Sequence, residues 1–142
     1  MIPELGQIFL VAALASALFQ FLGGISPLLN KIENIETFID RVTTFQTISL
    51  VICFALLTTS FLQDDFSVLY VASNSNTALP IGYKFAAVWG GHEGSLLLWV
   101  LILSLWTLLL SKDKALKSSP DLRIQSLSIL GLISLGFLIF IL

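Results

Sequence analysis

The chain has 142 residues, of which 56% are hydrophobic and only 11% charged, with a mean hydropathy of +0.96. Soluble domains carry about 25% charged residues, so this composition excludes a soluble globular protein. The formal net charge of −2, without a basic patch, gives no reason to expect a nucleic-acid partner. Cys53 is the only cysteine, which excludes a disulfide within the chain and CxxC redox chemistry.

Four long stretches are almost free of charge. Residues 5–30, 42–63 and 124–142 contain no Asp, Glu, Lys or Arg, and residues 85–111 contain only Glu93. A helix needs about 20 apolar residues to cross the hydrocarbon core of a bilayer. We therefore expect an all-α integral membrane protein with four transmembrane helices, at about 5–29, 42–62, 85–110 and 124–142.

The N-terminal segment MIPELGQIFLVAALASALF has some features of a secretory signal peptide. It lacks a basic n-region and a small-residue cleavage site, and its apolar run is longer than an h-region. We interpret it as a retained first helix.

The distribution of lysine and arginine predicts the orientation in the membrane. Six basic residues lie between the first and second or the third and fourth helices: Lys31, Arg41, Lys112, Lys114, Lys117 and Arg123. The connection at 63–84 has one, Lys84, together with Asp64 and Asp65. Short loops rich in Lys and Arg stay in the cytoplasm. Both termini and the 63–84 connection are therefore expected on the outer side of the membrane.

The outer connection, QDDFSVLYVASNSNTALPIGYK, is longer than a tight turn requires. Its first part alternates imperfectly with period 2, through Phe66, Val68 and Tyr70. Its second part holds four turn-forming residues, Asn74, Ser75, Asn76 and Pro80. We expect an ordered segment on the membrane surface, while a mobile loop stays open as the alternative.

The third stretch contains an unusual motif, AAVWGGHEGSLLLWVLILSLW, at residues 86–106. On an unbroken helix, one face within an arc of about 120° would hold Trp89, His92, Ser95, Trp99 and Trp106. Gly90 and Gly94 would point the other way, as a G-x-x-x-G pair that lets another helix approach closely. Glu93 would project between these two faces.

These residue types suggest several kinds of chemistry. His92 could ligate a metal or haem iron, or shuttle a proton. Glu93 could accept a hydrogen bond from an imidazole or be held protonated, since an ionised group at the bilayer centre costs about 2.5–3.5 kcal/mol. Trp89 and Trp99 could stack on a flat, apolar cofactor.

Structural roles for the same residues are also plausible. His92 would lie only about 10 Å from the outer end of the helix by helical rise, within reach of water. Tryptophans near helix ends are ordinary interface anchors, which is the interpretation we favour for Trp106. For His92 and Glu93, a functional role and specific helix packing both stay open.

Enzyme motifs do not fit the segment. His92 and Glu93 lack the second histidine of H-E-x-x-H. Ser95 lies three residues from His92 on the same helix, which does not build the geometry of a nucleophilic triad. A lone histidine makes no structural zinc site. We predict no catalytic residue and no metal site within this chain.

Several blocks in order, MIPELGQ, DFSVLYVASNSN, LPIGYK and above all WGGHEGSLLLW, resemble the N-terminal part of the CcmF/NrfE family of haem lyase components. The resemblance covers nearly the whole chain. It implies a large polytopic membrane protein that helps transfer haem from a haem chaperone to apocytochrome c, where thioether bonds form with CxxCH cysteines.

The resemblance also implies a set of partners and an incomplete site. The family's Trp-rich WWD segment and its ligand histidines for a b-type haem lie further along the chain than this sequence extends. The sequence is thus expected to be an N-terminal fragment or a split subunit. Its partners would be the remainder of the haem lyase, the haem chaperone, apocytochrome c and thiol-handling maturation subunits, within the lipid bilayer. Trp89, His92 and Trp99 would support the haem cavity.

Two other classes of function were weighed. A proton- or ion-pathway subunit of a transporter would use His92 and Glu93, but it predicts further charged residues in the other three stretches, which have none. A purely structural membrane subunit predicts that His92 can be replaced as long as packing survives.

The orientation can be tested by thiol labelling of intact cells in a Cys53→Ser background. Single cysteines near Asn74 should react with a membrane-impermeant reagent. Cysteines at 30–41 and 111–123 should be shielded. Labelling at position 114 but not at 74 would overturn the orientation.

Overall fold

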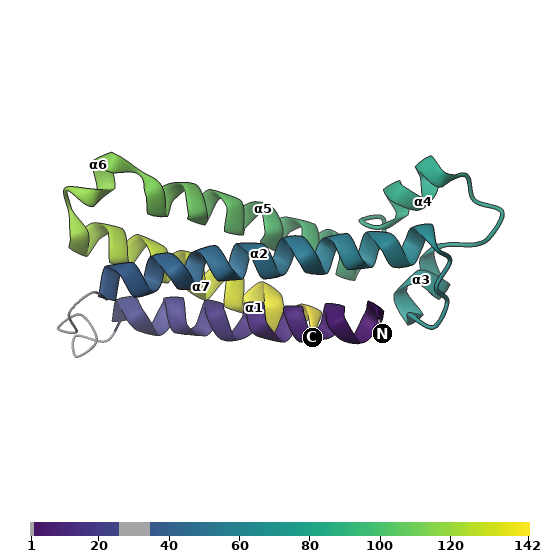
Figure 1. Cartoon of the computed structure of the whole chain (residues 1–142), viewed down its shortest axis with the longest axis horizontal. Coiled ribbons are helices and arrows are strands. Elements are labelled where there is room, and N and C mark those ends of the chain that lie inside the picture. The colour runs from purple at the N-terminus through teal and green to yellow at the C-terminus, as the bar shows by residue number, and fades with distance from the viewer. Residues whose placement is uncertain (1, 26–34) are drawn as a thin grey trace.

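The computed structural model describes residues 2–25 and 35–142, and the described residues form an all-helical structure (Figure 1). Four helices are long: α1 (Ile2–Ile25), α2 (Ile35–Leu62), α5 (His92–Lys112) and α7 (Pro120–Ile141). Three are short: α3 (Leu69–Asn74), α4 (Ile81–Ala87) and α6 (Lys114–Lys117). The four long helices are each long and apolar enough to cross a membrane, which confirms the four spans expected of the described residues.

The helix bounds differ from the expected ones. α2 begins at Ile35 rather than near residue 42, so Glu36 and Asp40 lie in its first turns, where acidic side chains favour the positive end of the helix dipole. α7 likewise begins at Pro120, before the uncharged stretch. Residues 26–29, expected to end the first helix, and Lys31 lie outside the described part of the chain. α2 and α7 are therefore longer than their uncharged stretches, and the additional turns at their N-terminal ends carry charged residues.

The long helices form a four-helix bundle in which α1 and α5 each pack against both α2 and α7. Figure 1 shows the N-terminal end of α1 and the C-terminal end of α7 on the side of the bundle that carries α3 and α4. Seven buried residues make the central core: Ala13, Ala17, Leu50, Cys53, Leu97, Val100 and Leu138. The free thiol of Cys53 packs there as a small hydrophobe.

α1 and α7 approach each other closely through small residues. A Cβ atom on Gly131 would lie 2.9 Å from the backbone nitrogen of Phe21. The amide of Gln20 donates to the carbonyl of Leu127 at 2.8 Å, and the hydroxyl of Ser128 donates to the carbonyl of Phe21 at 2.6 Å. Such small residues and interhelical hydrogen bonds are typical of membrane helices, where burial from water does not drive association.

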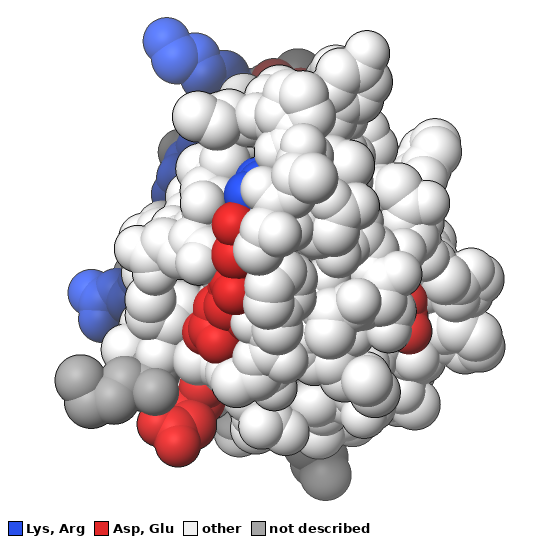
Figure 2. Space-filling view, turned by 90° about the vertical axis from the view of Figure 1, so that its right-hand side faces the viewer, with Lys and Arg blue, Asp and Glu red and all other residues white. Residues whose placement is uncertain are grey.

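The segment between α2 and α4 contains the short helix α3 and several turns. The period-2 alternation was misleading, because residues 69–74 form the helix α3. Lys84 is buried and forms an ion pair of 2.5 Å with Asp64, whose backbone has a positive φ of 53°. Figure 2, which views this end of the bundle, shows a narrow band of acidic side chains on an otherwise mainly uncharged face.

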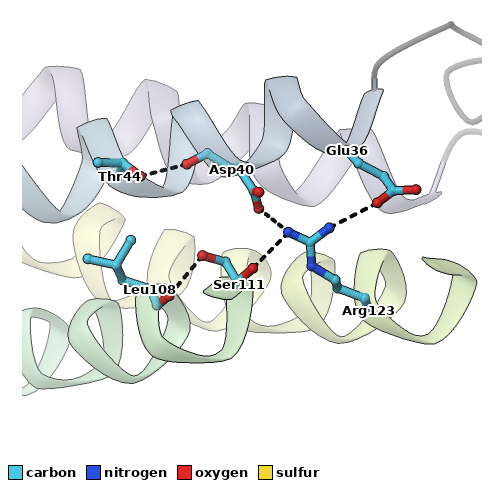
Figure 3. A network of polar contacts seen from close by, with 6 residues as sticks. All are labelled: Glu36, Asp40, Thr44, Leu108, Ser111 and Arg123. Atoms are coloured by element: carbon cyan, nitrogen blue, oxygen red, sulfur yellow. Dashed lines mark hydrogen bonds and ion pairs between the residues drawn. The ribbon is translucent and has the colours of Figure 1, made fainter. Parts of the chain in front are cut away.

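At the opposite end, Arg123 joins three helices (Figure 3). Its guanidinium donates from α7 to Glu36 at 3.0 Å and to Asp40, both on α2, and to the backbone carbonyl of Ser111 on α5 at 2.7 Å. The residue is only 2% exposed, so its charge depends on these partners. Arg123 thus fixes the relative positions of α2, α5 and α7 at this end.

Replacing Arg123 with Met should lower the free energy of unfolding in detergent micelles by about 3 kcal/mol, since two carboxylates lose their partner. The matched control is Arg41→Met, because Arg41 is exposed on the same end of α2. Equal losses for the two variants would contradict the role assigned to Arg123.

Candidate functional site

The chain leaves the helical conformation inside the WGGHEGS segment. α4 ends at Ala87 and α5 begins at His92. Between them, the amides of Val88, Trp89 and Gly90 each donate to the carbonyl three residues earlier, at 3.3, 3.4 and 3.1 Å. Gly91 is then extended, with φ −100° and ψ 177°. The prediction of one helix over 85–110 is therefore wrong, and the high glycine content of the segment is the local physical reason.

The break separates residues that the sequence had placed on common faces. Trp89 precedes α5, so it does not share a helical face with His92 and Trp99. Gly90 likewise lies outside α5, so Gly90 and Gly94 are not a G-x-x-x-G pair on one helix. His92 and Trp99 still share a face of α5, because seven residues correspond to nearly two helical turns.

Tyr70 of α3 occupies the break. Its hydroxyl donates to the carbonyl oxygen of Val88 at 3.1 Å and accepts from the backbone amide of Gly91 at 3.0 Å. One side chain thus satisfies two backbone groups of the turn, which would otherwise need water or another partner.

Two glycines make room for this side chain. A Cβ atom on Gly91 would lie 2.7 Å from Cε2 and 2.8 Å from the hydroxyl oxygen of Tyr70. A Cβ atom on Gly94 would lie 2.5 Å from that hydroxyl oxygen and still closer to the carbonyl oxygen of Val88. Gly90 differs, because its nearest neighbour would be Ala87 at 3.5 Å, an ordinary contact. Gly94 therefore packs against the preceding turn and α3.

The ring of Tyr70 is held from the end of α2. It makes an edge-to-face contact with Phe61, with ring centroids 5.4 Å apart. Phe61, Val71 and Val88 are fully buried beside it and form a separate apolar cluster. Burial raises the pKa of the Tyr70 hydroxyl, which keeps its proton available to the Val88 carbonyl.

His92 is the first residue of α5 and faces α7. Its ring is exposed and lies 5.5 Å from that of Phe140, tilted by 60°. It lines an open groove of about 410 Å³ whose other walls are Leu96, Ile133, Gly136, Phe137 and Phe140. The hydroxyl of Ser95 donates to the backbone carbonyl of His92 at 2.9 Å, which caps the turn and does not involve the imidazole.

Glu93, the next residue, faces a different space. It lines a cavity of about 300 Å³ between α1, α2, α3, α5 and α7, together with Tyr70, Cys53 and mainly apolar side chains. His92 and Glu93 are adjacent in sequence, yet they serve two separate hollows. Among the described residues, no hydrogen bond joins the Glu93 carboxylate to the His92 imidazole.

The three tryptophans lie in different surroundings. Trp89 makes an edge-to-face contact with Phe85, with ring centroids 5.2 Å apart. Trp99 and Trp106 are 63% and 65% exposed on α5, so both rings are available to lipid or to another protein surface. The anchor interpretation of Trp106 stays a prediction.

The fit to a haem group can be judged from the donor set. No group of three or more His, Cys, Asp or Glu side chains with metal-ligand spacing occurs among residues 2–25 and 35–142. His92 supplies one imidazole above an apolar groove, which suits a single axial ligand or the edge of a flat apolar group. These residues fit one wall of a haem site and would hold it only together with other protein surfaces.

Sequence reasoning missed Tyr70 as a member of the site. Tyr70 is the one polar aromatic residue in the apolar run before the SNSN turn, and three of the five residues at 90–94 are glycine. A hydroxyl that could serve backbone groups next to a glycine-rich break was thus visible, but its partner lies about 20 residues later in the chain.

These features define the class of protein: a multi-pass α-helical membrane protein with an ordered segment packed over one end of its bundle. No family model matches the chain. The cytochrome c-type biogenesis protein CcmF of Pseudomonas aeruginosa is 45% identical over 145 residues, covering 99% of this chain and 21% of that protein. The cytochrome c-type biogenesis protein NrfE of Haemophilus influenzae is 42% identical over 142 residues, covering 100% of this chain and 22% of that protein.

A solved structure agrees with these relatives. A chain named cytochrome c heme lyase CcmF matches with a TM-score of 0.88 and 27% identity, over 97% of this chain and 23% of that one. The chain therefore belongs to the CcmF/NrfE family of cytochrome c-type biogenesis proteins. It spans about a fifth of the length of the curated relatives that it matches.

The glycine geometry gives a direct test. Gly94→Ala should destabilise the fold by about 1–3 kcal/mol, because the new methyl group overlaps the Val88 carbonyl and the Tyr70 hydroxyl. Gly90→Ala should be tolerated. The measurement is the amount of folded full-length protein in the membrane and its thermal midpoint in detergent, and similar losses for both variants would argue against this geometry.

Proposed function

We propose that this chain takes part in the attachment of haem to apocytochrome c, as a component of a cytochrome c haem lyase. The observation that supports this most is similarity over 99–100% of the chain to CcmF and NrfE proteins, combined with the matching fold of a heme lyase CcmF. Because the chain spans only about a fifth of its relatives' length, it contributes one part of that activity.

The chain would lie in the inner membrane with the α3–α4 end in the periplasm. The basic residues support this orientation, since Lys112, Lys114 and Arg123 lie at the opposite end of the bundle. At the α3–α4 end, Lys84 is neutralised by Asp64, so it offers little charge to hold that end in the cytoplasm. Haem attachment would take place on the outer side, over the site at the α4–α5 break.

Within the complete assembly, the WGGHEGS segment would support one wall of the haem cavity. His92 presents its imidazole at the start of α5 beside Phe140, and Trp99 extends the same face deeper into the membrane. Trp89 would cover the entrance from the turn. The iron of a b-type haem would supply the redox and ligand-binding chemistry, and the residues named here would position its apolar edge and exclude water.

The partners follow from this role. The exposed apolar faces of α5 and α7 would contact the remainder of the haem lyase and the lipid bilayer. The outer segment would meet the haem chaperone, apocytochrome c and the thiol-handling subunits that keep its cysteines reduced. Glu93 faces the interior cavity and is therefore assigned a role separate from that of His92.

Replacing His92 with Ala in the complete protein should reduce cytochrome c maturation at least several-fold without lowering the amount of protein, because the exposed ring contributes little to packing. The readout is covalent haem stain on a reporter cytochrome, normalised to the membrane level of the protein. Ser95→Ala is the matched control, as its hydroxyl only bonds the local backbone. Normal maturation by the His92 variant would show that haem attachment does not require this imidazole.

A further inference from the structure

The two backbone groups that bind Tyr70 are those that a continuous helix would use. In an unbroken α-helix, the amide of Gly91 would donate to the Ala87 carbonyl, and the Val88 carbonyl would accept from the amide of His92. In the structure, the Gly91 amide and the Val88 carbonyl both bind the hydroxyl of Tyr70 instead. The side chain therefore stabilises the broken form at the groups where the broken and continuous forms differ.

We propose that Tyr70 is a positioning residue, which keeps α4 and α5 separate and thereby sets the directions of His92 and Glu93. For its functional consequence this inference rests on the proposed role in haem attachment. Its structural part stands on the contacts of Tyr70 alone.

Within the described part of the chain, no side-chain cap holds the first turn of α5. Its N-cap is Gly91, and no side-chain hydrogen bond caps this end of the helix. A helix end without a cap can move by a residue or more, since its first amides have no intrahelical acceptors. Unwinding of the first turn would take its first two residues out of their helical positions, so that His92 would leave the α7 groove and Glu93 the cavity lined by α1 and α2.

Tyr70 is itself held in place by contacts with neighbouring residues. Its ring packs on Phe61 at the end of α2, and the side-chain amide of Asn74 donates to its backbone carbonyl at 2.9 Å. The neighbouring Val71 is fully buried. Tyr70 therefore links the start of α5 to the end of α2, a helix that packs directly against α5.

The requirement is for a hydroxyl that donates and accepts at once, on a ring of this length. Phenylalanine keeps the ring and its contact with Phe61 but provides neither hydrogen bond. Glycine at 91 and 94 is the complementary requirement, since a Cβ atom at either position would fall within 2.8 Å of the Tyr70 hydroxyl oxygen. Tyr70, Gly91 and Gly94 therefore act as one unit.

The test compares Tyr70→Phe with Tyr83→Phe in the complete protein. Tyr83 is 68% exposed on α4 and serves as the matched control. Hydrogen exchange of a peptide covering residues 88–95 should become about fivefold faster in the Tyr70 variant, as expected for the loss of one net hydrogen bond. Cytochrome c maturation per folded molecule should fall several-fold, while the Tyr83 variant should match the parent in both readouts.

Unchanged exchange at 88–95 in Tyr70→Phe would overturn the inference, as would faster exchange with normal maturation in a protein where His92→Ala is defective. If both His92→Ala and Tyr70→Phe mature cytochrome normally while exchange at 88–95 is faster in Tyr70→Phe, the proposed function of the segment fails. The structural role of Tyr70 at the α4–α5 break is then still supported. Should Tyr70→Phe not accumulate, Gly91→Ala provides the second variant. It keeps the hydroxyl but displaces the ring, and it should give the same local increase in exchange.

Discussion

The hydrogen bonds of the Tyr70 hydroxyl to Val88 and Gly91 are the interaction on which the candidate site depends. A chain that interrupts a helix at the edge of a membrane exposes backbone groups that need partners, and water is a poor substitute inside packed protein. Here one phenol group supplies both. Because the break sets the first residue of α5, it also decides which hollow each of His92 and Glu93 enters.

The two ends of the bundle are organised by different physics. At one end, Arg123 brings a buried charge into contact with two carboxylates and a carbonyl, and it fixes α2, α5 and α7 relative to one another. At the other end, the fixing contacts are hydrogen bonds and apolar packing around Tyr70, Phe61 and Val88. Most of the charged residues thus lie away from the α3–α4 end, where the charges are mainly those of Asp64, Asp65, Lys84 and Glu93.

The sequence was sufficient to predict the four spans, because their signal is the local composition of about 20 residues. It was insufficient for the break at Val88–Gly91, because glycine content only weakens a helix and does not decide where it stops. The partner that decides this, Tyr70, lies 18 to 21 residues earlier and is brought into place by the fold of α3 on α2. The sequence placed Lys84 in the same connection as Asp64 and Asp65, but it did not indicate the ion pair with Asp64, whose partners are 20 residues apart.

The relation to longer relatives places these features in context. The chain spans about a fifth of the length of the CcmF and NrfE proteins, and we propose that its outward apolar faces, including Trp99 and Trp106, contact the remainder of a larger protein. Within such an assembly, a rigid start of α5 is useful, because side chains that line a ligand cavity must be held by their supporting contacts. Gly91 and Gly94 are therefore structurally important, because they leave the space that the Tyr70 side chain occupies.

A double-mutant cycle between Tyr70→Ala and Gly91→Ala tests whether the Tyr70 ring and the α4–α5 turn are in direct contact. The free energy of unfolding of the complete protein in detergent would be measured for the parent, both single variants and the double variant. The two nearest neighbours of a methyl group at 91 are atoms of the Tyr70 ring and hydroxyl, and both are absent from Tyr70→Ala, so the double variant should be no less stable than Tyr70→Ala alone. Strictly additive losses would show that the two positions are independent and would contradict the account.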